Sequence, residues 1–267
     1  MPTLIKIKYI LIALLYFFVT PLLLLFLFHT HWLMSVFIIF IIYSIGGLIF
    51  YIVYPQIDFS KNTILRGPKN KNWIMLTFDD GPSQDTPQLL DLLRKHKVPA
   101  TFFLLGEKIL RYPSIAQAIV HDGHSIGNHT FSHEKLTFKN KRFVNETISQ
   151  TQKIIQNNLG IDAQCIRAPH GFKNVWLYEI LKEKKLKLVS WTKSAFDTEN
   201  NVTSENIKKR IVKNIKNGDI ILLHDGRGMN NNPGFMSMIH ALPEIIIQLK
   251  KMNFEFVTLT DIVHEIY

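Results

Sequence analysis

The chain has 267 residues, of which 47% are hydrophobic, with one cysteine and a formal net charge of +10. One cysteine excludes an intrachain disulfide, and the length allows one ordinary domain with an additional segment, or two small domains. Much of the basic charge lies in residues 182–187 and 208–216, where no nucleic-acid-binding motif accompanies it. In the second stretch, the apolar residues have helical spacing, so we interpret its bases as a solvated helix face and predict no nucleic-acid partner.

The amino-terminal part, residues 1–58, is predicted to be a membrane anchor. Residues 9–28 and 32–54 are apolar runs without a charged residue, separated by His29-Thr30-His31. Each run reaches the length of about 20 residues that crosses a bilayer, and together they are too long for one crossing. The apolar part of a cleaved signal peptide is shorter and ends at small residues. The pattern therefore predicts a transmembrane helical hairpin in contact with membrane lipid.

The flanking charges predict the orientation of this hairpin in the cell membrane. Lys6 and Lys8 precede the first run, basic residues from Lys61 onward follow the second, and the turn between the runs carries no Lys or Arg. The positive-inside rule then places both chain ends, and the domain that follows, in the cytoplasm. One uncounted crossing would invert this orientation, so an extracytoplasmic domain is the alternative.

After a polar linker over residues 59–71, residues 72–267 read as one α/β domain. The hydrophobic pattern predicts strands over residues 73–77, 100–105, 186–191, 219–223 and 255–259. It predicts helices over residues 86–95, 113–121 and 143–159. Such alternation favours a parallel sheet or an α/β barrel, in which the chemistry lies at the carboxyl ends of the strands.

Two pairs of side chains suggest a metal centre. Asp79 and Asp80 follow the first predicted strand; a lone Asp-Asp-Gly is more often a surface turn, but beside a metal one carboxylate can ligate while the other holds a water. His129 and His133 are four residues apart, and on a helical turn this spacing places both rings on one face, about 5–6 Å apart. Two imidazoles and a carboxylate with open positions are typical of a catalytic zinc-like site.

Four further residues have ordinary interpretations when each is taken alone. Arg167 could form a surface salt bridge, His224 could be a hydrogen-bonded core histidine, and Asp197 lies in a loop after a predicted strand. Cys165 is interpreted as a small buried apolar residue rather than as a nucleophile.

Together, five segments resemble the motifs of a known family in order and spacing. They are LTFDDGP, IGNHTFSH, RAPHG, SWTKSAFDT and ILLHDG. They are similar to those of the polysaccharide deacetylase family, also known as the NodB-homology domain or carbohydrate esterase family 4, over about residues 72–262. The resemblance implies a distorted (β/α) barrel, preceded here by the predicted hairpin.

The resemblance also implies roles for individual residues. Asp80, His129 and His133 would hold one divalent metal ion, usually zinc, with cobalt or another divalent ion as an alternative. Asp79 would be the general base that activates a water. Arg167 would orient Asp79 and tune its charge.

The remaining implied roles concern the leaving group and the substrate. His224 would be the general acid, with Asp197 as its partner. Leu222 would line the pocket for the acyl methyl group, and the backbone N–H after Pro169, that of His170, would help to hold the oxyanion. These residues and Trp191 form the predicted substrate-binding set, which comprises Pro169, His170, Trp191 and Leu222.

The sequence departs from the family pattern at two positions. His170 stands where Tyr or Trp is usual, and Thr198 follows Asp197 where Trp is usual, which weakens any inference about the sugar. The predicted function is metal-dependent hydrolysis of an N-acyl, typically N-acetyl, amide on an amino sugar of a glycan or lipid-linked saccharide. The alternative is a catalytically inactive carbohydrate-binding relic, which would be expected to lose a ligand, base or acid, yet all are present. No protein partner can be inferred.

Overall fold

The computed structural model describes residue 19 and residues 32–53, 63–225 and 234–266. The chain forms two compact units, Met1–Tyr51 and Ile52–Tyr267. Apart from Val19, the first predicted transmembrane run lies outside the described residues, and the second coincides with helix α2 (Trp32–Val53). Within the described ranges, no helix meets the length and hydropathy that a membrane crossing requires.

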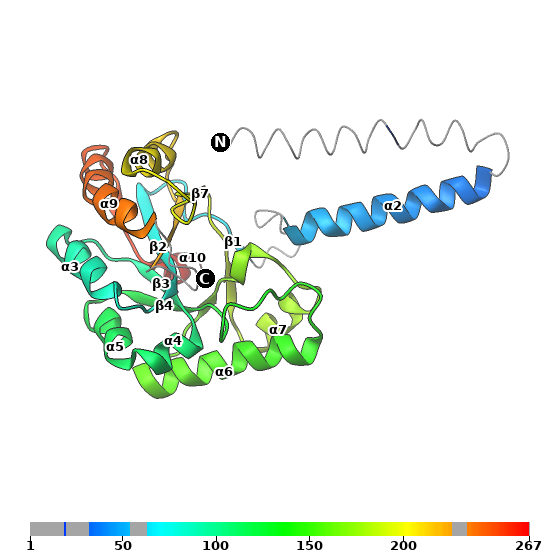
Figure 1. Cartoon of the computed structure of the whole chain (residues 1–267), viewed down its shortest axis with the longest axis horizontal. Helices are drawn as coiled ribbons and strands as arrows, with labels where there is room; N and C mark the ends of the chain where they lie inside the picture. Colours follow the sequence, from blue (N-terminus) through cyan, green and yellow to red (C-terminus); the bar gives the residue numbers. More distant parts are fainter. Residues whose placement is uncertain (1–18, 20–31, 54–62, 226–233, 267) are drawn as a thin grey trace. The chain divides into compact units, whose positions relative to one another are not determined.

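The second unit is built on one parallel sheet, as predicted (Figure 1). Its strands pair in the order β1-β6-β5-β4-β3-β2-β8-β7, with β9 beside β2, and every pair is parallel. The strands are β1 (Thr63–Ile64), β2 (Trp73–Gly81), β3 (Thr101–Leu104), β4 (Ser125–Asn128), β5 (Cys165–Ile166), β6 (Lys187–Val189), β7 (Lys193–Ser194), β8 (Ile220–His224) and β9 (Glu255–Phe256). Among the described strands no pairing joins β1 to β7, so the curled sheet stays open as a distorted barrel.

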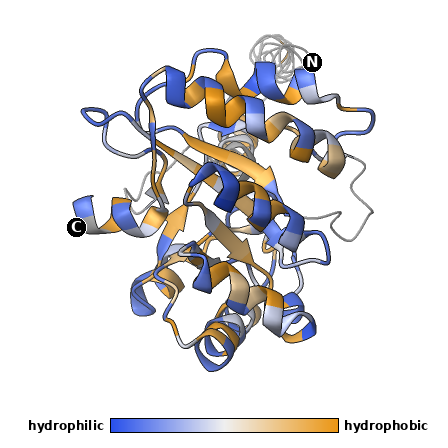
Figure 2. Cartoon of the chain, turned by 90° about the vertical axis from the view of Figure 1, so that its left-hand side faces the viewer, coloured by the Kyte–Doolittle hydropathy of each residue, from blue (hydrophilic) through white to orange (hydrophobic). Residues whose placement is uncertain are grey.

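Helices connect the strands and most of them cover the outer face of the sheet (Figure 1), whereas the last helix contributes Leu259 and Ile262 to an inner apolar cluster. They are α3 (Thr86–His96), α4 (Gly106–Arg111), α5 (Pro113–His121), α6 (Lys141–Leu159), α7 (Leu177–Glu183), α8 (Ser204–Val212), α9 (Gly234–Lys251) and α10 (Leu259–Ile266), with a 3-10 turn η1 (Pro169–Gly171). Figure 2 shows hydrophobic strands inside and hydrophilic helix surfaces outside, which is the pattern of helices packed on a parallel sheet.

Side-chain alternation along the strands separates the core into an outer and an inner part. On β2, Ile74, Leu76 and Phe78 belong to the large apolar cluster under the helices, whereas Met75 belongs to a smaller cluster with residues of β3, β5, β6, β8 and α10. Because successive side chains on a strand point to opposite faces, Thr77 and Asp79 continue the inner row begun by Met75. The same alternation places Arg167, Leu222 and His224 on the inner side. The polar side chains Thr77, Asp79, Arg167 and His224 therefore share the inner side of the sheet.

The predicted elements agree with the structure in kind, with three local differences. The last predicted strand is cut to β9, because α10 already begins at Leu259. Within the predicted linker, Thr63–Ile64 forms β1 and pairs with β6, so the sheet begins before residue 72. Strands β5 and β7 have two residues each, too few for a hydrophobic period to reveal them, and β4 (Ser-Ile-Gly-Asn) lacks an apolar run.

Candidate active site

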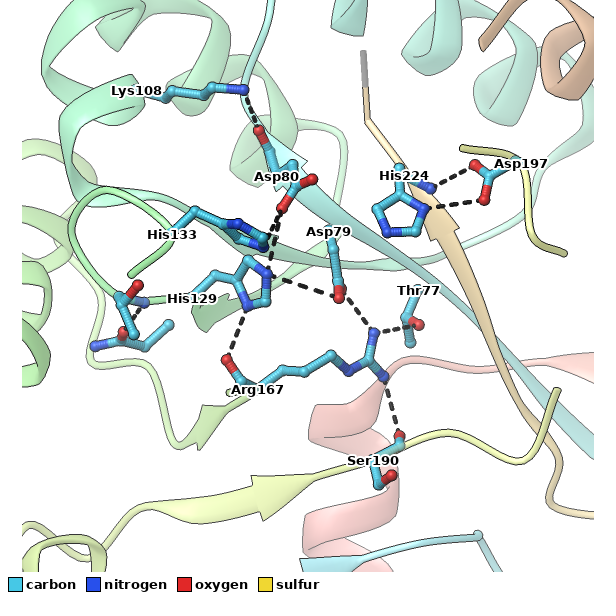
Figure 3. Close-up of polar contacts among 12 residues, drawn as sticks. Thr77, Asp79, Asp80, Lys108, His129, His133, Arg167, Ser190, Asp197 and His224 are labelled. Atoms are coloured by element: carbon cyan, nitrogen blue, oxygen red, sulfur yellow. Dashed lines mark hydrogen bonds and ion pairs between the residues drawn. The ribbon is translucent and has the colours of Figure 1, made fainter. Parts of the chain in front are cut away.

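A bulge at the end of β2 directs two consecutive carboxylates into the same site. On a regular strand, neighbouring side chains point to opposite faces. Asp79 pairs with Phe103 and Gly81 pairs with Leu104, so Asp80 is an extra residue between them. Its φ of 69° is left-handed, a conformation that Asp adopts more readily than most residues. The bulge therefore turns Asp80 back towards the side that Asp79 already faces (Figure 3).

The two histidines come from the loop after β4, and the prediction of a helical turn for them was wrong. Thr130 and His133 both have positive φ, of 69° and 60°, which a helix does not allow. The Asn128 side chain accepts from the Thr130 N–H at 2.9 Å and starts the loop instead. The rings of His129 and His133 nevertheless lie 5.1 Å apart between centroids, at the predicted spacing.

Asp80, His129 and His133 together form a set that fits a divalent cation. Asp80 Oδ1 lies 3.3 Å from His129 Nε2 and 3.2 Å from His133 Nε2, and one ligand atom from each residue lies within 4.8 Å of the others. Asp80 Oδ1 is buried and has no hydrogen-bond partner within the described structure. A buried oxygen of this kind, beside two imidazole nitrogens, is the donor set that zinc-like ions prefer.

The surroundings of these ligands favour the protonation states that bind a metal. Burial alone would raise the pKa of Asp80, but its contact with His129 and the charges of His224 and His133 hold that pKa well below its usual value. Burial lowers the pKa of His133 to about 4. His129 Nδ1 lies 2.8 Å from the Arg167 carbonyl oxygen, and donation to that oxygen leaves Nε2 with a lone pair facing Asp80.

Asp79 is held by a fully buried arginine. Arg167 Nη1 donates to Asp79 Oδ1 at 2.7 Å and to Thr77 Oγ1 at 2.8 Å, while Nη2 donates to the Ser190 carbonyl at 3.1 Å. The guanidinium also lies over the Phe103 ring, 4.2 Å from its centroid. Asp79 Oδ2 lies 3.8 Å from His129 Nε2, so the second oxygen faces the candidate metal ligands.

His224 and Asp197 form a second pair, on the other side of Asp79 in Figure 3. Asp197 Oδ1 lies 2.9 Å from His224 Nδ1, and Asp197 Oδ2 accepts from the His224 backbone N–H at 2.8 Å. Burial alone would lower the pKa of His224, but the charge and hydrogen bond of Asp197, with the charges of Asp80 and Asp79, raise it to about 9. An imidazolium with Nε2 directed away from Asp197 can donate a proton.

The predicted substrate-binding residues lie around these groups to different extents. The exposed His170 sits in η1 with a φ of 59°, and its ring centroid lies 4.5 Å from that of His133. Pro169 beside it is buried. Leu222 lies on β8 two residues before His224 and is 6% exposed. The half-buried Trp191 lies beside Arg167, with its ring centroid 5.7 Å from the guanidinium carbon.

Several groups in the site were not predicted. Thr77, Ser190 and Lys108 contact Arg167 or Asp80, and only Thr77 carried a signal, since it shares the strand face of Asp79. The thiol of Cys165 is buried and burial raises its pKa to about 12, which agrees with its interpretation as an apolar residue.

Known proteins are similar to this chain in both sequence and fold. Residues 66–189 match the polysaccharide deacetylase family. A peptidoglycan-N-acetylglucosamine deacetylase of Bacillus cereus is 37% identical over 72% of this chain and 69% of its own length. The solved structure of the Bc1960 peptidoglycan N-acetylglucosamine deacetylase is 35% identical, with a TM-score of 0.71 over 75% of this chain and 92% of that one.

A third similar protein was solved with a metal. The family 4 acetyl xylan esterase of Clostridium thermocellum, in complex with a cobalt ion, is 31% identical, with a TM-score of 0.65 over 71% of this chain and 89% of that one. The family match, the identity to the Bacillus cereus relative and the common fold agree with one another. This chain belongs to the polysaccharide deacetylase family and is a hydrolase of that family.

Proposed function

We propose that this protein removes N-acetyl groups from N-acetylglucosamine units of a glycan in a metal-dependent reaction. The observation that carries the proposal is the arrangement around Asp79. The candidate ligands Asp80, His129 and His133 lie on one side of this carboxylate and the His224–Asp197 pair lies on the other (Figure 3). Amide hydrolysis needs a base for water and an acid for the departing amine, and this arrangement offers both.

Asp80, His129 and His133 would hold the metal ion, with zinc as the first candidate because of the His, His and carboxylate donor set. When bound, such an ion supplies a Lewis acid that polarises an amide carbonyl and a coordinated water. The Clostridium thermocellum relative was solved in complex with a cobalt ion, which supports the binding of a divalent ion by this family.

Asp79 would act as the general base. The ion pair with Arg167, together with the other two hydrogen bonds of that guanidinium, fixes the direction of Asp79 Oδ1. Asp79 Oδ2, on the side of His129, then takes a proton from the attacking water. The backbone N–H of His170 would hold the oxygen on which negative charge develops.

His224 would act as the general acid. Its Nδ1 is occupied by Asp197, so Nε2 carries the proton that passes to the amine nitrogen as the carbon–nitrogen bond breaks. An amine leaves poorly without that proton, and the charge of Asp197 keeps the ring protonated near neutral pH. Leu222, on the same face of β8, would contact the acetyl methyl group.

The identity of the sugar is supported by the relatives, several of which are named as deacetylases of peptidoglycan N-acetylglucosamine. The side of the membrane on which the catalytic unit lies decides whether its substrate is a lipid-linked saccharide or the assembled polymer. We further propose that the apolar residues 9–28 and 32–54 anchor the chain and that their flanking charges place the catalytic unit in the cytoplasm, where a lipid-linked saccharide is within reach. An extracytoplasmic unit would act on the assembled polymer.

The proposal is tested by measuring acetate release. The full-length chain, purified in detergent and loaded with Zn²⁺, is incubated with N-acetylglucosamine oligomers and, separately, with acetylated xylan. We expect acetate from the amide substrate and its loss in the Asp79→Asn variant. Acetate from xylan alone would reject the amide as substrate, and equal release by Asp79→Asn would reject the assigned chemistry.

A further inference from the structure

Asp80 occupies a backbone conformation that its own strand does not stabilise. It is the extra residue of the β2 bulge, and its left-handed φ of 69° is unfavourable for a residue with a side chain. Such a conformation persists only where the surroundings impose it. Since Asp80 is also a candidate metal ligand, the groups that impose its conformation also decide where its carboxylate lies.

One such group is Lys108 on α4. Beyond the bulge, the next hydrogen bond runs from the N–H of Leu105, the residue after β3, to the Gly81 carbonyl at 3.0 Å. The carbonyl of Asp80 itself accepts from Lys108 Nζ at 2.6 Å (Figure 3). Lys108 is half-buried and binds the backbone of Asp80, not its carboxylate. The lysine thus fixes the peptide plane that leads out of the bulge.

The second group is the buried Asp225, which follows His224 at the end of β8. Its backbone N–H donates to the Asp79 carbonyl at 2.7 Å. Its carboxylate accepts from Thr86 Oγ1 at 2.8 and 2.9 Å. A Cβ built on Gly81 would lie 2.2 Å from Asp225 Oδ2, so this carboxylate fills the space where a side chain at position 81 would stand. The residues on either side of Asp80 are therefore both in contact with Asp225.

We propose that Lys108 and Asp225 are positioning residues that hold the Asp80 bulge in its metal-binding shape from its two sides. The inference rests on the proposed function, because it takes Asp80, His129 and His133 as the metal ligands. Neither residue touches a group that would react. Both act through the backbone of β2, by fixing the residue that carries the carboxylate.

Electrostatics and positioning predict opposite effects for the removal of Lys108. The ammonium group is a positive charge near a cation site, so by Coulomb's law alone its loss would strengthen the binding of a divalent ion. If Lys108 instead holds the bulge, its loss lets Asp80 leave the left-handed conformation, and metal binding weakens. The sign of the change in metal affinity therefore separates the two roles.

The experiment compares three lysine variants of the full-length chain in detergent. Lys108→Met removes both charge and donor, while Lys108→Arg keeps both. Lys250→Met is the matched control, because Lys250 Nζ donates to the His96 carbonyl at the same 2.6 Å, away from the site. The dissociation constant for Zn²⁺ is measured by chelator competition, and the absorption bands of bound Co²⁺ report the ligand geometry.

We expect Lys108→Met to weaken Zn²⁺ binding about 10–100-fold, the usual effect of losing a group that orients a ligand, and to alter the Co²⁺ bands. Lys108→Arg should restore both, and Lys250→Met should match the wild type. Unchanged or tighter binding by Lys108→Met would overturn the assignment. If Lys108→Met does not fold, Lys108→Gln takes its place, with the same directions expected and the same results overturning the assignment.

The wild-type measurement separates this inference from the proposed function. If the wild type binds no divalent ion, the proposed metal site is wrong and the role of Lys108 falls with it. If the wild type and Lys250→Met bind Zn²⁺ tightly and Lys108→Met binds it equally well, only the positioning role is wrong.

Discussion

Arg167 donates to Asp79 across a 2.7 Å ion pair in which both side chains are almost inaccessible to solvent. The two residues lie 88 positions apart in the sequence and meet because β5 and β2 direct them to the same inner face of the sheet. A buried carboxylate is unstable as an anion without such a partner. The pair therefore joins the stability of the fold to the charge of the proposed base.

Removal of Arg167 should destabilise the protein through the charge that remains on Asp79. Breaking a buried ion pair costs about 3–5 kcal/mol, so Arg167→Met should lower the thermal unfolding midpoint strongly. The double variant Arg167→Met/Asp79→Asn removes the unpaired charge and should recover part of this loss. Arg142→Met is the control, since the exposed Arg142–Glu146 pair has the same 2.7 Å distance and should contribute little. A double variant as unstable as the single one would contradict this account.

Replacement of the proposed base should remove activity without removing the metal. Asp79→Asn keeps the shape of the side chain and can still accept from Arg167, but it cannot take a proton. Its rate should fall about 10²–10⁴-fold, the usual contribution of general base catalysis. Metal content is measured on the same sample by atomic emission. Near-normal acetate release with full metal content would exclude this role for Asp79.

The pH dependence should report His224. The acid must be protonated to act, so activity is present below its pKa and falls as pH rises through it. Burial lowers the pKa of His224, but Asp197 opposes this effect and raises the pKa to about 9. A divalent ion at Asp80 would bring the alkaline limb of the pH profile below that value, because a nearby positive charge disfavours the imidazolium. Asp197→Asn removes the nearest negative charge and should move the limb to still lower pH. A limb that does not move would show that Asp197 does not tune His224.

The sequence predicted the parts of the site that depend on local pattern. A hydrophobic strand followed by Asp79, and another followed by His224, placed both residues at the carboxyl edge of a parallel sheet, and the structure has them on adjacent strands. The spacing of His129 and His133 brought their rings together as expected, although the loop is not helical.

The remaining parts depend on contacts that no local pattern encodes. The bulge at Asp80 arises from the register between β2 and β3, and a strand pattern alone would send Asp79 and Asp80 to opposite faces. Lys108 reaches Asp80 from a separate helix, and Ser190 reaches Arg167 through its backbone carbonyl. These contacts follow from the tertiary arrangement and were visible only in the structure.

The orientation in the membrane is tested with reporter fusions. Basic residues flank both outer ends of the apolar runs and none lies in the turn. A green fluorescent protein fused after Tyr267 should therefore fluoresce, and an alkaline phosphatase fused at the same position should be inactive. The matched control places the same reporters after His31, where the opposite result is expected. Strong phosphatase activity after Tyr267 would place the catalytic unit outside and direct the substrate search to the assembled glycan.

The most direct test of the central claim is a titration of metal against activity in one sample. Full-length protein stripped by a chelator is supplied with Zn²⁺, and bound metal and acetate release from N-acetylglucosamine oligomers are followed together. Activity should rise with occupancy and level off near one ion per chain, while His129→Ala and His133→Ala should bind no ion tightly and release no acetate. Full activity in the stripped protein, or unchanged metal content in both histidine variants, would contradict a metal-dependent deacetylase centred on Asp80, His129 and His133.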